Sequence, residues 1–246
     1  MHVAVLFVTA LGWEARQLLR GLAPSNPTER GSATLWTGTC PLGEVAVLQT
    51  GIGADRADAG LRAAVEIVTP DVVVSTGCAG ALDPALATGD LVIADQIVDG
   101  SGGRVATSAR WRERYLRAAD RAGTGSITAS MLSSTDVLLG PESKRAQASR
   151  SGAVAVEMEG MALARRAEAF GIEFAAARVM LDPADVSLPA DVIASADAYG
   201  RTNPVRLAAA VVRRPRLVPE LVRLGSMTAR CRRVLFVVHG ELLRTA

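Results

Sequence analysis

Short runs of apolar, often β-branched residues recur along the chain and are separated by longer mixed stretches. The runs are continuous rather than alternating, which is typical of strands covered on both faces, as in α/β proteins. We expect strands at Val3–Val8, Val45–Gln49, Val72–Ser75, Leu91–Ala94 and Ala175–Leu181. These five segments predict a sheet with helices on both sides.

The stretches between the strands carry apolar residues at helical spacing. We expect helices at Gly12–Leu22, Ala54–Val68 and Glu157–Phe170, and an exposed helix in the charged stretch Arg110–Arg121. The order of strands and helices favours parallel pairing. The prediction is an α/β fold, a single domain over residues 1–246 with a central mixed, mainly parallel sheet flanked by helices.

The character of the chain changes from about Asp191. Residues 204–243 read as helices separated by Pro215 and Pro219, which predicts a helical C-terminal extension of the same domain over residues 191–246. Seven arginines of this extension lie between residues 213 and 233: Arg213, Arg214, Arg216, Arg223, Arg230, Arg232 and Arg233. Two interpretations stay open. Either the apolar positions pack on the domain and the arginines are solvated, or the arginine face meets an anionic membrane surface.

Composition narrows the function. Hydrophobic residues make up 49% of the chain and aromatic residues only 4%, so the core must be built from aliphatic side chains. A net charge of +2 does not point to a nucleic-acid partner. The chain has three cysteines without a CxxC pair and two histidines near opposite ends. We therefore expect no disulfide framework, no metal site, no cofactor and no Ser/His triad.

The pattern also bears on location. The first apolar run lacks a basic leader, and no apolar run reaches the roughly 18 residues of a membrane span. We therefore expect a cytoplasmic protein. Lys144 is the only lysine in a chain rich in arginine, which we interpret as an effect of base composition.

Carboxylates follow three of the expected strands. Glu14 comes after the first strand, Glu157 and Glu159 flank Met158 where a strand gives way to a helix, and Asp182 ends the last strand. Ligands of open α/β sheets gather beyond the carboxyl ends of the strands, so these side chains are placed for chemistry. Where the strand gives way to a helix, we expect that Glu157 and Glu159 cannot both face the core. On spacing alone, each carboxylate could instead begin a helix or a turn.

Two glycine clusters also follow strands. The segment Gly51–Ala57 imitates a dinucleotide-binding fingerprint, but Arg56 stands where the third glycine belongs. The segment Ser75–Leu82 consists of small residues that let a substrate approach the backbone. Its Cys78 is interpreted as a packed residue, because no histidine is placed to activate a thiol.

Taken in order, these motifs match a family. The chain has an N-terminal strand followed by Ala-x-x-x-Glu, then Gly51-Ile52-Gly53, Thr76-Gly77-x-Ala79-Gly80, Gly89-Asp90-Leu91-Val92, Val156-Glu157-Met158-Glu159 and Arg178-x-x-x-Asp182. The ordered set spans roughly residues 1–190 and resembles the 5′-methylthioadenosine/S-adenosylhomocysteine nucleosidases and their relatives.

The resemblance implies a role for each polar residue of these motifs. Asp182 would be the acid that protonates or hydrogen-bonds purine N7, and Glu14 would activate water. Glu159 would hold the ribose hydroxyls, Met158 would pack on the sugar, and Arg178 would orient the Glu159 carboxylate. The reaction implied is cleavage of the N-glycosidic bond of a purine nucleoside.

The resemblance also implies the lining of the pocket. Glu157, Cys78 and Ala79 would line it, with Cys78 replacing a serine that is common in the nucleosidases. Leu138 and Leu139 fall near the position of the aromatic residue that usually stacks on the base.

Further details resemble one branch of the superfamily, the hopanoid-associated phosphorylases, which are assigned to the removal of adenine from adenosylhopane. The details are Gly51–Ala57, Leu82-Asp83-Pro84-Ala85-Leu86 and the arginine- and proline-rich C-terminal helices. The chain lacks an N-terminal Gly-Asp-Pro-x-Arg phosphate loop, and Glu14 favours water as the acceptor. We expect a homodimer that releases adenine from a 5′-substituted adenosine, with peripheral contact at the inner face of an anionic membrane as an open option.

Several alternatives stay open at this stage. The protein could be a methylthioadenosine/S-adenosylhomocysteine or futalosine-type nucleosidase, or it could use phosphate in place of water. Two other classes are a nucleotide-binding oxidoreductase built around Gly51–Arg56 and a nucleoside sensor without turnover.

Overall fold

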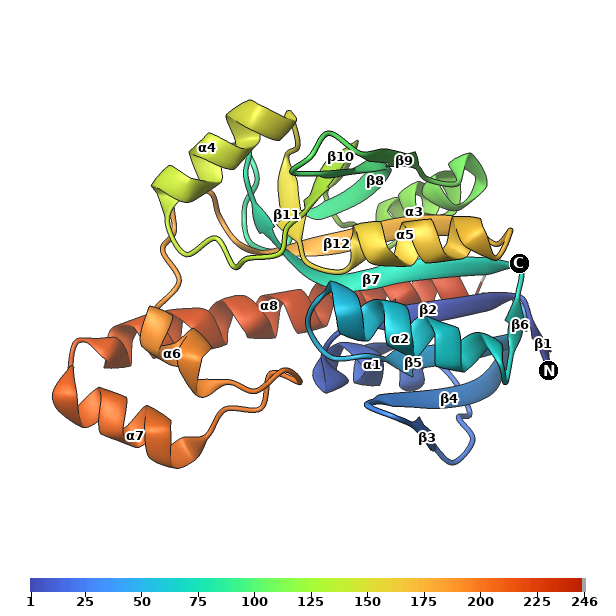
Figure 1. Ribbon diagram of the computed structural model, residues 1–246, viewed down its shortest axis with the longest axis horizontal. Coiled ribbons are helices and arrows are strands. Elements are labelled where there is room, and N and C mark those ends of the chain that lie inside the picture. The colour runs from blue at the N-terminus through green and yellow to red at the C-terminus, as the bar shows by residue number, and fades with distance from the viewer. Residues whose placement is uncertain (245–246) are drawn as a thin grey trace.

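A mixed sheet of ten strands forms the centre of the molecule, with helices on both faces (Figure 1). The computed structural model describes residues 1–244. The sheet runs in the order β11-β10-β8-β12-β7-β2-β5-β4-β3, with β9 paired to β8. Its strands are β2 (Val5–Thr9), β3 (Thr28–Arg30), β4 (Ala33–Cys40), β5 (Gly43–Gln49), β7 (Val72–Ala81), β8 (Leu91–Asp99), β9 (Arg104–Ala106), β10 (Ser126–Ser133), β11 (Ala155–Glu157) and β12 (Glu173–Asp182). The short strands β1 (His2–Val3) and β6 (Thr69–Pro70) pair separately.

Eight helices complete the described part of the chain. They are α1 (Gly12–Leu19), α2 (Ala54–Val65), α3 (Ala109–Arg121), α4 (Pro141–Ser151), α5 (Gly160–Ala169), α6 (Ala190–Ser195), α7 (Pro204–Arg213) and α8 (Leu217–Arg244). One aliphatic core cluster includes buried residues of α2 and α5, and a second cluster, on the other side of the sheet, includes those of α1, α3 and α8. The predicted α/β fold with flanking helices is therefore confirmed.

The sheet is mixed, as expected. The strand β2 is parallel to β5 and β7, and β12 is parallel to β7. The pairings β12–β8, β11–β7 and β4–β5 are antiparallel. Because β2, β7 and β12 run side by side in one direction, their carboxyl ends lie at one edge of the sheet.

Two sequence expectations for helices need correction. The helix α3 is only partly exposed, because Trp111 and Tyr115 on one face pack into the core. The helix α8 runs through Pro219 without a break. Pro219 lies in the first turn, where a backbone N–H has no partner within the helix, so proline is tolerated there. Only Pro215 separates α7 from α8.

The C-terminal extension divides into two parts. The second half of α8 buries Cys231, Leu235, Val238 and Leu242 against the domain, as the packing interpretation predicts. The helices α6 and α7 and the start of α8 project from the sheet as a lobe, at the left of Figure 1. Within residues 1–244, no helix is both long and apolar enough to cross a membrane.

Candidate active site

A cavity of about 200 Å³ lies at the carboxyl edge of the central strands. Nine of the ten predicted site residues line it: Glu14, Cys78, Ala79, Leu138, Glu157, Met158, Glu159, Arg178 and Asp182. Leu139 is the exception. Its side chain is 37% exposed and its carbonyl accepts a hydrogen bond from Leu188 N–H, so it belongs to the loop outside the cavity.

Glu14 is held in the first turn of α1 by two backbone donors. Its Oε2 accepts from Leu11 N–H at 3.0 Å and its Oε1 accepts from Cys78 N–H at 2.8 Å. Gly77 makes room for the carboxylate, since a Cβ at this position would lie 2.6 Å from Glu14 Oε1. Burial raises the pKa of Glu14, while Arg178 opposes the shift. A carboxylate with a raised pKa is a stronger base than an exposed glutamate.

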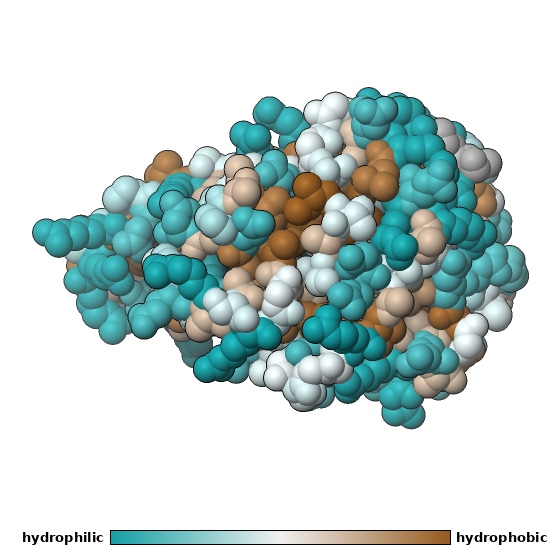
Figure 2. Space-filling view, turned by 90° about the horizontal axis from the view of Figure 1, so that it is seen from above, coloured by the Kyte–Doolittle hydropathy of each residue, from teal (hydrophilic) through white to brown (hydrophobic). Residues whose placement is uncertain are grey.

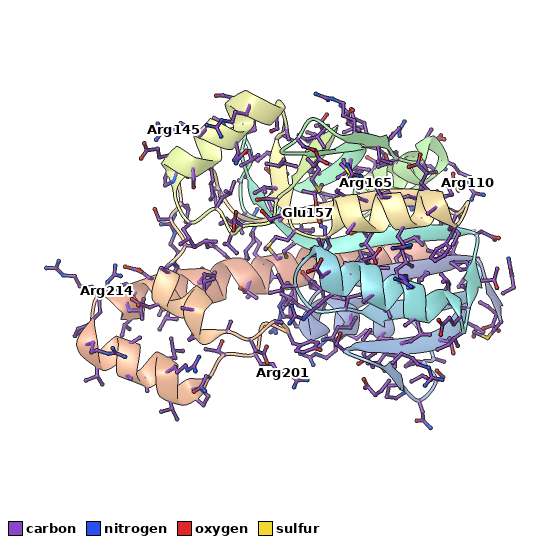
Figure 3. The ribbon with its side chains drawn as sticks, viewed as in Figure 1. Arg110, Arg145, Glu157, Arg165, Arg201 and Arg214 are labelled. Carbon is purple, nitrogen blue, oxygen red and sulfur yellow. The ribbon has the colours of Figure 1, made fainter. Side chains whose placement is uncertain are left out.

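The prediction that Glu157 and Glu159 cannot both face the core is wrong, since both side chains are buried. The strand β11 ends at Glu157, and Glu159 is the residue that precedes α5, so the two side chains belong to a turn in which both can point inward. Arg178 Nη2 donates to Glu157 Oε2 at 2.9 Å and to Glu159 Oε2 at 3.3 Å. One buried guanidinium thus contacts two carboxylates, and its single positive charge balances only one of them. Figure 3 shows Glu157 in the interior beside the start of α5.

The glutamates keep some of their hydrogen-bonding capacity free. Within residues 1–244, the buried atoms Glu157 Oε1 and Arg178 Nε have no hydrogen-bond partner. Burial raises the pKa of Glu159 to about 7, helped by the neighbouring Glu157 and opposed by Arg178. Buried polar atoms without partners are rare and indicate a place for a bound polar group or water.

The glycine segment before α2 serves the same site. Gly53, in a backbone conformation that favours glycine (φ 103°), donates its N–H to Glu159 Oε1 at 2.9 Å. This N–H therefore holds a carboxylate of the protein itself. In a dinucleotide-binding turn the corresponding backbone groups face a bound phosphate.

Asp182, at the end of β12, contacts a residue that sequence reasoning missed. Lys144 Nζ lies 2.5 Å from Asp182 Oδ2, and both side chains are buried. Burial raises the pKa of Asp182, and the Lys144 charge opposes that shift. The sequence carried one usable signal for Lys144. It is the single lysine of the chain, and all the other long basic side chains are arginines.

Cys78 lines the cavity as a neutral thiol. Burial and the neighbouring Cys231 raise its pKa well above the usual value. His239 is buried elsewhere, with its Nε2 3.0 Å from Thr76 Oγ1, and burial lowers its pKa to about 3. Within residues 1–244, no group of three or more histidine, cysteine, aspartate or glutamate side chains is placed to hold a metal ion.

The fold and site define an α/β protein with a buried, carboxylate-rich cavity at the carboxyl edge of its sheet. The chain belongs to the phosphorylase superfamily, whose family model matches residues 4–213. A 5′-methylthioadenosine/S-adenosylhomocysteine nucleosidase of Haemophilus influenzae (strain PittGG) is 27% identical over 196 residues, which cover 72% of this chain and 85% of that protein.

Solved structures agree with the fold. A futalosine hydrolase mutant of Helicobacter pylori matches with a TM-score of 0.66 and 21% identity, over 74% of this chain and 86% of that one. An S-adenosylhomocysteine nucleosidase of Streptococcus pyogenes, in complex with 5-methylthiotubericidin, matches with a TM-score of 0.67 and 23% identity over 75% and 85% of the two chains. A protein of Weissella paramesenteroides matches over 100% of both chains with a TM-score of 0.73 and 16% identity.

Proposed function

We propose that this protein hydrolyses the N-glycosidic bond of a 5′-substituted adenine nucleoside and releases adenine. The observation that carries the proposal is the set of carboxylates around one cavity. Asp182 lies beside a buried cation, Glu14 between two backbone donors, and Glu157 and Glu159 around one guanidinium. Cleavage of a nucleoside needs a proton donor at the base, an activated nucleophile and partners for the ribose hydroxyls.

Asp182 is the residue we assign to the base. The purine leaves poorly as an anion, so a proton at N7 must arrive as the C1′–N9 bond breaks. A carboxyl whose pKa is raised by burial holds a proton more readily near neutral pH. Asp182 therefore fits the general acid.

Glu14 is the residue we assign to water. Its raised pKa suits a base that takes one proton as the water oxygen attacks C1′. Glu159 and Glu157, with an unpartnered oxygen on Glu157, suit the ribose hydroxyls, which donate to carboxylates. Met158 would pack on the sugar, and the oxocarbenium character of the transition state is stabilised by the surrounding negative charge.

The 5′ substituent meets an apolar part of the cavity. The apolar lining includes Ile52, Val137, Leu138, Leu181 and Leu188. Such walls suit the purine face and an apolar 5′ group. Adenosylhopane is our preferred substrate, and methylthioadenosine, adenosylhomocysteine and futalosine, which the names of related proteins suggest, are the alternatives.

A substrate panel tests this assignment. We expect adenine release from 5′-substituted adenosines, with the highest kcat/KM for an apolar 5′ chain, measured by separation of the free base. Higher kcat/KM for methylthioadenosine or futalosine would transfer the assignment to those nucleosidases. Binding of adenine nucleosides without any turnover would instead indicate a sensor, and retention of a nicotinamide cofactor on purification would indicate an oxidoreductase.

Replacing Glu159 by glutamine should weaken ribose recognition. A hydrogen bond to a charged group contributes roughly 1.5–3 kcal/mol, so kcat/KM on a ribonucleoside should fall by about 10-fold to 100-fold. The loss should be smaller on the 2′-deoxy substrate, which has already lost one partner. Glu168→Gln, an exposed change within α5, the helix that follows Glu159, is the matched control. Equal losses on both sugars would show that Glu159 does not contact the 2′-hydroxyl.

We also propose that the projecting lobe contacts an anionic membrane, where a lipid-tailed nucleoside would be found. All residues of α7 keep some solvent exposure, and Val205, Val212 and Val222 are largely exposed. Exposed arginines lie near these valines in the sequence: Arg206, Arg213, Arg214, Arg216 and Arg223. Figure 2 shows this lobe, at the left, as mostly hydrophilic with single apolar residues between, and Figure 3 shows Arg214 at its tip. A surface that combines exposed apolar side chains with cations suits an interface with anionic lipid.

Liposome sedimentation tests the membrane contact. We expect binding to vesicles that contain phosphatidylserine, no binding to phosphatidylcholine vesicles, and weaker binding as salt rises, because each arginine contributes about 1 kcal/mol at such a surface. Glutamine at Arg213, Arg214, Arg216 and Arg223 should remove the binding and leave cleavage of a short soluble nucleoside intact. Glutamine at four exposed arginines of the body, Arg62, Arg104, Arg145 and Arg150, is the control. If the protein does not bind anionic vesicles at low salt, the proposed membrane contact of the lobe is wrong.

The homodimer stays a prediction of the family resemblance. Analytical ultracentrifugation of the full chain should give twice the mass of 25.6 kDa. A monomer would show that the cavity is complete within one chain.

A further inference from the structure

Lys144 is the one lysine of the chain, and the structure places it beside the proposed acid. Its side chain comes from α4 and is fully buried. The ammonium Nζ lies 2.5 Å from Asp182 Oδ2 and donates to the carbonyls of Pro183 at 2.7 Å and Val186 at 2.9 Å. Base composition explains why lysine is scarce in this chain. It does not explain why the one lysine is buried against a carboxylate.

The three contacts allow two protonation states. An ammonium has three N–H groups, and here they meet two carbonyls and one carboxylate oxygen. If one proton moves to Asp182 Oδ2, the neutral amine still donates to Pro183 and Val186, and its lone pair accepts from the new O–H. Both states leave every group satisfied, so the proton can lie on either atom without loss of a hydrogen bond.

Burial also brings the two states closer in energy. Each ion of a buried pair loses its hydration, whereas the neutral pair avoids much of that cost. The other ionisable residues that line the cavity are Asp136, Glu14, Glu157, Glu159, Arg178 and Cys78. Arg178 is already bonded to Glu157 and Glu159, and Glu14 to backbone donors, so Lys144 is the direct ionic partner of Asp182.

We propose that Lys144 is a positioning residue that shares one proton with Asp182 and stores the proton that Asp182 passes to the purine. This inference rests on the proposed function. The same contacts tie α4 to the turn after β12, which fixes the Asp182 carboxyl at the edge of the cavity.

The proton transfers balance over one turnover. A proton moves from Lys144 Nζ to Asp182, and the carboxyl gives a proton to purine N7 as the C1′–N9 electron pair goes to the base. Water adds to C1′ and loses one proton to Glu14. Adenine and the free sugar leave, and the proton on Glu14 returns through water in the cavity to the Lys144–Asp182 pair.

The single lysine makes the pair directly observable. Protein labelled with [ε-¹³C]lysine gives one side-chain signal, whose shift reports the charge of Lys144 in the free protein. We expect this signal and the alkaline loss of adenine release to share one midpoint, because both report the same shared proton. In Asp182→Asn the midpoint of the signal should differ from that of the wild type, because the counter-charge at Asp182 is gone. A lysine that stays charged through the pH range in which activity is lost would overturn the shared proton.

Kinetics of Lys144→Met give a second readout. Without the lysine charge, burial alone acts on Asp182 and its pKa rises, so the alkaline limb of kcat/KM should move to higher pH. We expect kcat on an adenine nucleoside to fall by about 10-fold to 100-fold with KM little changed, less than the roughly 10²–10⁴ lost with the acid itself. A 4-nitrophenyl riboside, whose leaving group needs no proton, should be affected less.

The matched control is Arg145→Met, which removes an exposed cation from the next position of α4 and should leave both profiles unchanged (Figure 3). An unshifted pH profile in folded Lys144→Met would overturn the inference while leaving the proposed hydrolysis intact. If the wild-type protein releases no adenine from any nucleoside, the proposed function fails. In that case the NMR signal of Lys144 is the remaining test of the shared proton. Equal midpoints in the wild type and in Asp182→Asn would refute the sharing of a proton between Lys144 and Asp182.

Discussion

Asp182→Asn should reduce kcat for adenine release by about 10²–10⁴-fold, the usual contribution of a general acid. The amide has almost the same shape as the carboxyl but cannot give a proton to N7. It also leaves Lys144 without its counter-charge in a buried position. Rates measured on a purine nucleoside and on a 4-nitrophenyl riboside should therefore diverge, with the larger loss on the purine.

Asp185→Asn is the control for this change, because Asp185 is exposed in the turn that follows Asp182. It should keep the wild-type rate. Since breaking a buried ion pair can cost about 3–5 kcal/mol, the melting temperature of Asp182→Asn is measured alongside the rate. A folded Asp182→Asn protein with near wild-type kcat on an adenine nucleoside would show that another group protonates the base.

Glu14→Gln should abolish hydrolysis within the sensitivity of the assay. The amide oxygen cannot take the proton of the attacking water, and it can accept from only one of the two backbone donors, Leu11 N–H and Cys78 N–H, which bond different oxygens of Glu14. Binding should persist, because the residues assigned to the sugar and base are unchanged. The measurement is single-turnover adenine release together with substrate binding by calorimetry.

Glu44→Gln, an exposed change on β5, is the matched control. If Glu14→Gln still releases adenine at a normal rate when phosphate is present, the carboxylate is not the base and phosphate takes the role of water. A loss of binding equal to the loss of rate would make Glu14 a substrate ligand instead.

Much of the architecture could be predicted because it depends on local patterns. Continuous apolar runs identified β2, β5, β7, β8 and β12, and these are the strands at the centre of the sheet. The sequence analysis did not identify β4 and β10, whose runs mix threonine, serine and glycine with apolar residues. Strand pairing depends on contacts far apart in the chain, so the antiparallel β12–β8 pair had no local signal.

The site also has features with a local sequence signal and features that depend on contacts far apart in the chain. Nine of the ten residues implied by the ordered motifs line one cavity, because each motif stands at a strand end and the fold brings those ends together. Leu139 lies outside it, since a one-residue step along a loop redirects the side chain. Both Glu157 and Glu159 are bonded to Arg178, which is distant in sequence, so the local pattern alone gave the wrong expectation.

Lys144 was missed for a similar reason. It lies on α4, a helix of weak apolar pattern that the sequence analysis did not identify, and its partners Asp182, Pro183 and Val186 are about 40 residues away. A long-range contact between two charged residues leaves no periodic trace in a sequence. The fold therefore had to be known before the lysine and the acid could be connected.

The most direct test of the account is mass spectrometry of the products formed from a 5′-substituted adenosine in phosphate-free buffer and in phosphate. The account predicts adenine and a free 5′-substituted ribose in both buffers, at equal rates. A sugar 1-phosphate formed only in the presence of phosphate would contradict hydrolysis and make the enzyme a phosphorylase. An intact nucleoside in both buffers, across the full panel of 5′ groups, would contradict the cleavage of the glycosidic bond itself.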